Sequence, residues 1–178
     1  MTAGARTAGA GASPGPQDSP GFLLWRTTLR WQRCITRALR PMGLTHVQFV
    51  LLAAVWWLSD QAETPDDLPS QRQVADHAAT DVMMTSQVLR SLESRTLVTR
   101  SADPVDARAK RLTVTNAGRR LAERAITVVG AADTAFFHPV RDRAQLLDVL
   151  HQLDEMSCQH TTPSPAGGHA VAGVRARA

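Results

Sequence analysis

The stretch Leu68–Thr115, LPSQRQVADHAATDVMMTSQVLRSLESRTLVTRSADPVDARAKRLTVT, decides the fold of this 178-residue chain. Ser70 and Gln73 have the S-x-x-Q spacing of a capping box, which satisfies two free amide donors at a helix start. Thr80 or Asp81 can cap a second helix soon afterwards, and an acidic residue there also suits the positive end of the helix dipole. The stretch therefore predicts two short helices joined by a tight turn.

The second predicted helix has two different faces on a wheel of 3.6 residues per turn. We expect one face to pack against the protein, and it holds Met84, Thr85, Val88, Leu89 and Leu92. We expect the opposite face to point outward, and it holds Met83, Ser86, Gln87, Arg90 and Ser94. Glutamine can bond adenine, arginine can bond guanine, and serine can bond bases or phosphates, so this outward face suits DNA.

Two runs compatible with β-strands follow, from Leu97 to Ala102 and from Lys110 to Thr115. Pro104 marks the turn between them. We place Arg108 at or near the tip of this turn, where Asp106 can fix its guanidinium by a charge-assisted bond. An arginine held in this way suits a narrow minor groove. Helix, turn, helix and β-hairpin together predict a winged helix-turn-helix.

Three runs within this region resemble the MarR family of bacterial transcriptional regulators: SQRQVA, TSQVLRSLESRTLVTR and DPVDARAKRLTVTNAG. The D-x-R wing, the closing L-x-V-T strand and the glycine at the next helix start recur in that family in this order. The resemblance covers about residues 21 to 155. It implies a homodimer that binds an inverted repeat in double-stranded DNA, usually as a repressor that a small molecule releases.

The predicted DNA-binding residues are Ser70, Gln71, Arg72, Thr85, Ser86, Gln87, Arg90, Asp106, Arg108, Lys110 and Arg111. The formal net charge of +4 says little about nucleic acid by itself, so the prediction depends on how the charges are distributed. A winged helix that binds only other proteins is the alternative. Salt separates the two, because DNA binding weakens steeply as counterions compete.

The remaining chain predicts a mainly helical fold with a small β wing and helices on both sides of the DNA-binding lobe. We expect residues 45–115 to form that lobe, residues 21–42 and 116–156 to form dimerisation helices, and residues 1–20 and 157–178 to be disordered tails. Thr45 and Gln48 form a second capping box before an apolar helix that we expect to be buried. The terminal helices carry more apolar side chains than one chain can cover, which favours a twofold dimer.

Two further possibilities are a pocket for an effector and a reactive cysteine. Four aromatic or ring residues could line a pocket for a small aromatic effector: Trp31, His46, Phe49 and Trp56. Cys34, between Arg33 and Arg37, leaves a redox-responsive regulator open as an alternative, and Cys158 lies too far along the chain to predict a disulfide.

The sequence predicts no metal site, cofactor or enzymatic activity. The six histidines lack the spacing of a zinc site, and no catalytic triad or phosphate-binding loop appears. The longest apolar run, 49–58, is shorter than the about 20 residues that a membrane helix needs, so we expect a cytoplasmic protein without a membrane partner.

Overall fold

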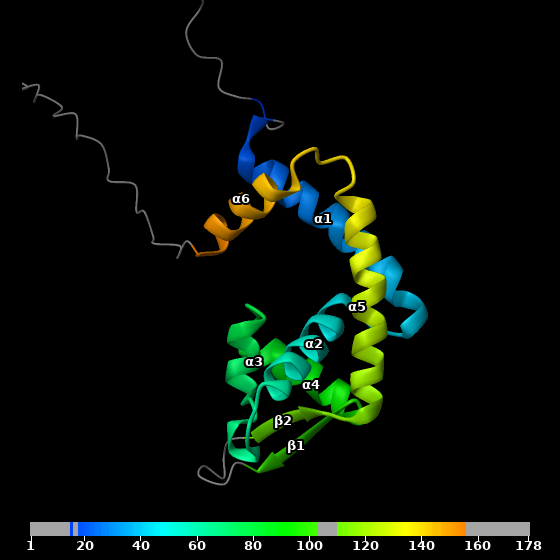
Figure 1. Cartoon of the computed structure of the whole chain (residues 1–178), viewed down its shortest axis with the longest axis vertical. Helices are drawn as coiled ribbons and strands as arrows, with labels where there is room; N and C mark the ends of the chain where they lie inside the picture. Colours follow the sequence, from blue (N-terminus) through cyan, green and yellow to red (C-terminus); the bar gives the residue numbers. More distant parts are fainter. Residues whose placement is uncertain (1–14, 16–17, 103–109, 156–178) are drawn as a thin grey trace, which may run out of the picture. The chain divides into compact units, whose positions relative to one another are not determined.

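A computed structural model describes residues 15, 18–102 and 110–155 of the chain. It divides into two compact units, Met1–Pro139 and Val140–Ala178, which are described separately. Within the described residues the fold is mainly helical with one two-stranded antiparallel sheet, which confirms the predicted winged helix-turn-helix class (Figure 1).

The first unit begins with α1 (Pro20–Leu39), whose end is set by Pro41 in the short 3₁₀ helix η2 (Arg40–Met42). Gly43 then turns the chain with φ +63°, a backbone angle that side chains with a Cβ rarely adopt. Helix α2 (His46–Asp60) starts with the predicted Thr45–Gln48 capping box, in which the Gln48 amide N donates to Thr45 Oγ1 at 3.2 Å. The loop after α2 contains a second 3₁₀ helix, η3 (Pro65–Asp67).

The predicted pair of helices follows as α3 (Gln71–His77) and α4 (Val82–Ser94). The Ser70–Gln73 capping box is present, and Asp81 is the residue that caps α4. The turn between the helices includes Ala79 with φ +48°, a conformation that residues other than glycine adopt only under constraint. The starts of α3 and α4 are therefore set by capping residues next to them in the sequence.

The sheet consists of β1 (Val98–Ala102) and β2 (Lys110–Val114), with Val98 opposite Val114 and Ala102 opposite Lys110. An isolated bridge joins Ser70 to Arg111, so the start of α3 is attached to the outer edge of the sheet. The predicted wing turn, with Asp106 and Arg108, lies outside the described residues. The structure thus fixes the root of the wing.

Helix α5 (Asn116–Phe136) runs from the sheet along α2 to α1, and Thr115 caps its start as predicted (Figure 1). Gly118 in its first turn lies against the carbonyl of Leu97, where an added Cβ would collide with the backbone. The second unit contains α6 (Arg143–Glu155), none of whose residues is buried.

The core of the first unit lies where α2 crosses the other helices and the sheet. Ile35 and Leu39 come from α1, and the largest buried group comes from α2: Leu51, Leu52, Ala54 and Val55. The strands add Val98 and Leu112. This confirms that α2 is the central buried helix, although its exposed Trp57 shows that one side remains open.

No single helix among the described residues is long and apolar enough to cross a bilayer. The combination of α1 with η2 and α2 meets the criteria of length and composition, but it bends by 76° between its two parts.

Candidate DNA-reading surface

Helix α4 presents a polar stripe because its other side belongs to the core. Leu89 and Leu92 are fully buried, while Gln87 and Arg90 are exposed and Ser86 is half-buried. The guanidinium of Arg90 donates from Nη2 to Ser86 Oγ at 3.1 Å. Ser86, Gln87 and Arg90 therefore lie together on one turn of helix, as the sequence predicted for the outward face.

At the start of α4 the structure buries Thr85 and exposes Met84. Thr85 is fully buried, and its Oγ1 donates to the Asp81 carbonyl and lies 2.8 Å from Thr80 Oγ1. Its hydroxyl joins the turn to the helix, so Thr85 lies on the packed face of α4, and its predicted contact with DNA stays a prediction. Met84 was expected to pack inward, but it is 39% exposed.

The start of α3 lies beside the start of α4. Gln71 Nε2 donates to the carbonyl of Val82 at 3.4 Å, and Arg72 forms an exposed ion pair with Asp76 at 3.8 Å. The Ser70 hydroxyl accepts from the Gln73 amide at 3.3 Å, so it is engaged in the capping box. Of the three residues predicted here, Arg72 is the most available to a phosphate, while Gln71 and Ser70 also hold the two helix starts in place.

Two arginines connect the sheet to the helices. Arg111 Nη1 donates to the Leu68 carbonyl at 2.8 Å, which attaches β2 to the segment before α3. Arg100 of β1 forms a 3.1 Å ion pair through Nε with Glu93 and approaches the Ser86 carbonyl at 3.5 Å. The Arg100–Glu93 contact is an ion pair without the geometry of a hydrogen bond. Lys110 is exposed at the end of the described wing, where its ammonium is available to a phosphate.

The four residues predicted to line one effector pocket separate into two pairs. Phe49 and Trp56 line a cavity of about 630 Å³ between α2, the end of α3 and α5. Its walls are mostly apolar, and Asp60 and His77 supply its charged or titratable groups. The indole Nε1 of Trp56 is buried without a hydrogen-bond acceptor. Trp31 and His46 do not line this cavity, so the structure does not bring the four residues together in it.

Trp31 and His46 instead form a joint between α1, α2 and α5. Trp31 Nε1 donates to Asp133 Oδ1 at 2.6 Å, and the His46 ring meets the edge of the Trp31 ring with centroids 5.0 Å apart. Burial lowers the pKa of His46 below its ordinary value, and the nearby Asp133 carboxylate partly opposes this shift. These residues were placed in a pocket because the sequence could not show that Asp133, 102 residues after Trp31, is their partner.

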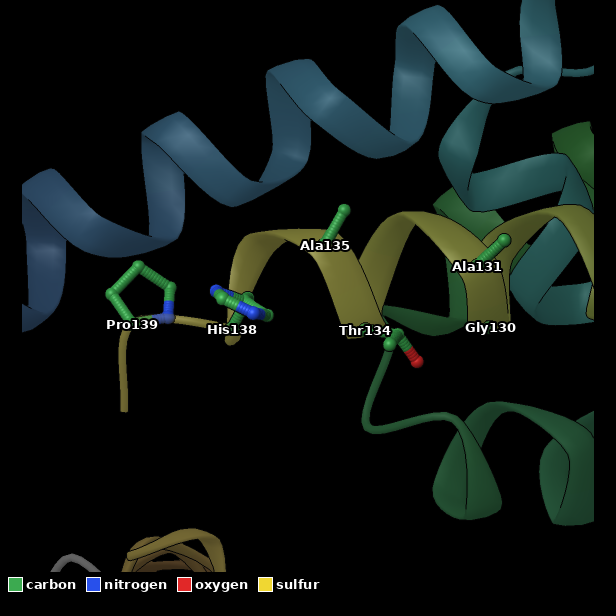
Figure 2. A pocket seen from close by; sticks show the side chains of 6 residues that line it. All are labelled: Gly130, Ala131, Thr134, Ala135, His138 and Pro139. Atoms are coloured by element: carbon green, nitrogen blue, oxygen red, sulfur yellow. The ribbon is translucent and has the colours of Figure 1, made fainter. Parts of the chain in front are cut away.

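A second hollow of about 600 Å³ lies along the last turns of α5 and is lined by Gly130, Ala131, Thr134, Ala135, His138 and Pro139. In Figure 2 Ala135 points toward α1 and the Thr134 hydroxyl points away from it. A smaller hollow of about 350 Å³ on the α1 side includes the exposed Cys34 with Arg37. Neither hollow combines several converging polar groups, so neither indicates a reaction.

The sequence matches no family model. It is 38% identical over 139 residues to the HTH-type transcriptional regulator YdcH of Bacillus subtilis, a match that covers 78% of this chain and 92% of YdcH. It is 36% identical over 117 residues to the HTH-type transcriptional repressor Rv2887 of Mycobacterium tuberculosis, covering 65% of this chain and 78% of Rv2887.

The structure of Rv2887, a MarR family protein in complex with salicylic acid, superimposes with TM-score 0.55 at 32% identity and covers 77% of this chain and 96% of Rv2887. The chain belongs to the MarR family. CouR of Rhodococcus jostii RHA1, solved with p-coumaroyl-CoA, is similar at 30% identity with TM-score 0.67, covering 82% of this chain and 98% of CouR. This MarR-family chain is therefore a DNA-binding transcriptional regulator.

The sequence did not single out Arg100 and Glu93, whose ion pair joins β1 to α4. Arg100 lies in a strand and Glu93 in a helix, and neither residue type is unusual there. The available signal was the placement of a charged residue opposite the buried Leu112 in the sheet register, which requires a nearby partner. That signal becomes visible only when the strands are paired.

Proposed function

We propose that this MarR-family protein is a homodimeric repressor that reads an inverted-repeat operator with α4 and is released by a small aromatic effector. The observation that carries the proposal is the outward stripe of Ser86, Gln87 and Arg90 over a buried Thr85, Leu89 and Leu92. A recognition helix in the major groove contacts base edges with such residues. The Arg90–Ser86 hydrogen bond orients a guanidinium that can bond a guanine with two N–H groups.

The exposed apolar side chains of the terminal helices support the dimer. Helix α6 leaves four large hydrophobic residues 38% to 54% exposed, namely Leu147, Val149, Leu150 and Leu153. On α1, Leu23, Leu24 and Trp25 are also exposed. Covering these surfaces with a second copy is favourable, because water is removed from both faces. A twofold pair of α4 helices would then bind half-sites about 34 Å apart on one duplex face.

The cavity beside α2 supports the effector. It has aromatic walls from Phe49, Trp56 and Trp57, and it touches His77 and Ala78 at the end of α3. The next residue, Ala79, is in the constrained turn that leads to α4. A ligand in this cavity would press on that turn and change the position of α4. Salicylic acid in Rv2887 and p-coumaroyl-CoA in CouR are aromatic ligands, which supports this ligand class for the present chain.

The test begins with selection of bound fragments from the source genome by the full-length protein. Affinity for the selected duplex is then measured by fluorescence anisotropy in 50 and 200 mM salt. Neutralisation of about six phosphates predicts a loss of roughly 10³-fold between these concentrations. Arg90→Ala should weaken specific binding by about tenfold or more, since each bidentate arginine–guanine contact discriminates by ~1–3 kcal/mol.

Arg124→Ala is the control, because it removes the same charge from an exposed position on α5. Equal effects of the two substitutions, or binding that ignores salt, would indicate a protein-only winged helix. Adding salicylate to the same samples should quench tryptophan fluorescence and release the duplex. Salicylate and related phenolic acids that change neither signal would remove the effector from the proposal.

A further inference from the structure

Helix α4 begins with three consecutive apolar residues that the fold leaves uncovered. The exposed fractions are 48% for Val82, 76% for Met83 and 39% for Met84. The value for Met83 is the highest among the exposed large hydrophobic side chains of the described residues. A single exposed apolar side chain is common on a protein surface, but three consecutive ones form a patch of the kind that marks an interaction site.

Met83 lies in line with the residues that are proposed to read DNA. Met83, Gln87 and Arg90 are spaced i, i+4 and i+7, which places them on one stripe of α4. The Asp81 carboxylate accepts from the backbone N of Met83 at 2.9 Å and fixes the first turn of the helix. All three side chains are exposed. Met83 therefore extends the polar reading stripe by one apolar position at the N-terminal end.

The chemistry of this position limits what Met83 can recognise. A thioether side chain has no charge and no strong hydrogen-bond donor, so it contributes little to phosphate binding. The apolar feature that the major groove offers is the C5-methyl group of thymine. Methionine is unbranched and flexible, so it can adapt its terminal methyl group to such a neighbour.

We propose that Met83 is a specificity-determining residue that packs on a thymine methyl group in each half-site. The inference rests on the proposed function, in which α4 enters the major groove. The rise from Met83 to Arg90 is about 10.5 Å along the helix. Base pairs are stacked about 3.4 Å apart and the major groove is inclined to the duplex axis, so the thymine lies at most about three base pairs from the base that Arg90 reads.

A deoxyuridine scan tests the proposal on the duplex that the full-length protein selects. Replacing one thymine with deoxyuridine removes the C5-methyl group and keeps every hydrogen-bonding group of the base. At one symmetry-related pair of positions, wild type should lose about fourfold in affinity per methyl group, the equivalent of one buried carbon. Substitution in both half-sites should then cost roughly 15-fold, because the two half-sites of a dimer act together.

The variants identify the side chain that touches the methyl group. Met83→Ala should bind the thymine and deoxyuridine duplexes equally, and Met83→Leu should restore part of the preference. Met84→Ala is the matched control from the same turn, and it should keep the wild-type response. Because Met83 is exposed, these changes should leave the unfolding midpoint unchanged, which separates recognition from folding.

Three results would overturn the assignment. If the wild-type protein keeps its affinity when deoxyuridine replaces thymine at every position, it contacts no thymine methyl group. Met83→Ala that remains as sensitive as wild type shows that another side chain reads it, and loss of self-association in Met83→Ala would assign the residue to a contact between copies. Failure of wild type to enrich any duplex would instead refute the proposed function, because it appears before the scan begins.

Discussion

Helices α4 and α6 have the same length of 13 residues and similar apolar content, yet the chain treats them differently. Helix α4 packs against α2, α3 and β1, and it buries Leu89 and Leu92 completely. Helix α6 buries none of its residues. An apolar stripe thus predicts that a helix face will be covered, but it does not say whether the cover comes from the same chain. Helix α4 buries its leucines within one chain, whereas α6 leaves its large apolar side chains exposed.

The largest expected effect comes from truncating one leucine in each helix. Leu92→Ala should lower the free energy of unfolding by about 2–5 kcal/mol at any protein concentration, because it opens a cavity in the core. Leu150, 38% exposed, should matter only when a second copy covers it. Leu150→Ala should therefore shift the monomer–dimer equilibrium and reduce the dependence of the urea midpoint on protein concentration.

Urea unfolding at two protein concentrations, together with sedimentation, measures both effects. Leu92→Ala should show the same loss at both concentrations. If Leu150→Ala at the lowest concentration proves as costly as Leu92→Ala, then α6 packs within its own chain and the contrast between the two helices fails.

The sequence predicted well those features that depend on residues a few positions apart. The capping boxes of Ser70 and Thr45 depend on a partner three positions away, so the starts of α3 and α2 were predicted correctly. The inward direction of Leu89 and Leu92 follows from helical periodicity in the same way. Local geometry determines these contacts before the chain folds.

The structure adds most where the sequence could not show which partner a side chain has. Periodicity placed Met84 on the packed face, but Met84 is 39% exposed, although the same turn of α4 buries Thr85. Thr85 is a polar residue on the inward face of α4. Its hydroxyl contacts Asp81 and Thr80 in the turn before the helix. The partner of Trp31 is Asp133 on another helix, so composition alone could not separate a structural joint from a ligand pocket.

A smaller effect should come from the link that orients α4 on the sheet. Arg100→Met removes the ion pair with Glu93 and should lower the unfolding free energy by about 1 kcal/mol, since the Glu93 side chain is 42% exposed and water screens the pair. Operator affinity should fall as well, because the same arginine approaches the Ser86 carbonyl. Arg72→Met is the control for stability, as its pair with Asp76 is almost fully in water and should change stability little.

Urea midpoints of the two variants, measured in parallel, decide the point. Equal midpoints for Arg100→Met and Arg72→Met would show that the Arg100–Glu93 ion pair adds no measurable stability. The difference between α4 and α6 would then lie only in how many of their apolar side chains are buried.

The smallest expected effect is a pH dependence at the joint between α1, α2 and α5. Burial lowers the pKa of His46 in the folded chain, so the unfolded chain takes up a proton first as the pH falls below the ordinary value of 6.5. Stability is therefore unaffected by His46 at higher pH and decreases as the pH drops through 6.5 toward the folded-state pKa. His46→Gln should remove this part of the decrease, measured as the difference in Tm between pH 8 and pH 5.5.

Asp133→Asn should change the same slope in the opposite direction. The Asp133 carboxylate raises the pKa of His46 and so reduces the difference between the folded and unfolded chains. Asparagine keeps an oxygen that can accept from Trp31 Nε1 but loses the charge, so the Tm should fall more steeply in acid than in wild type. If Asp133→Asn and His46→Gln both keep the wild-type slope, the pKa of His46 is the same in the folded and unfolded chains. Burial of His46 between α1, α2 and α5 would then contribute nothing to the pH dependence of stability.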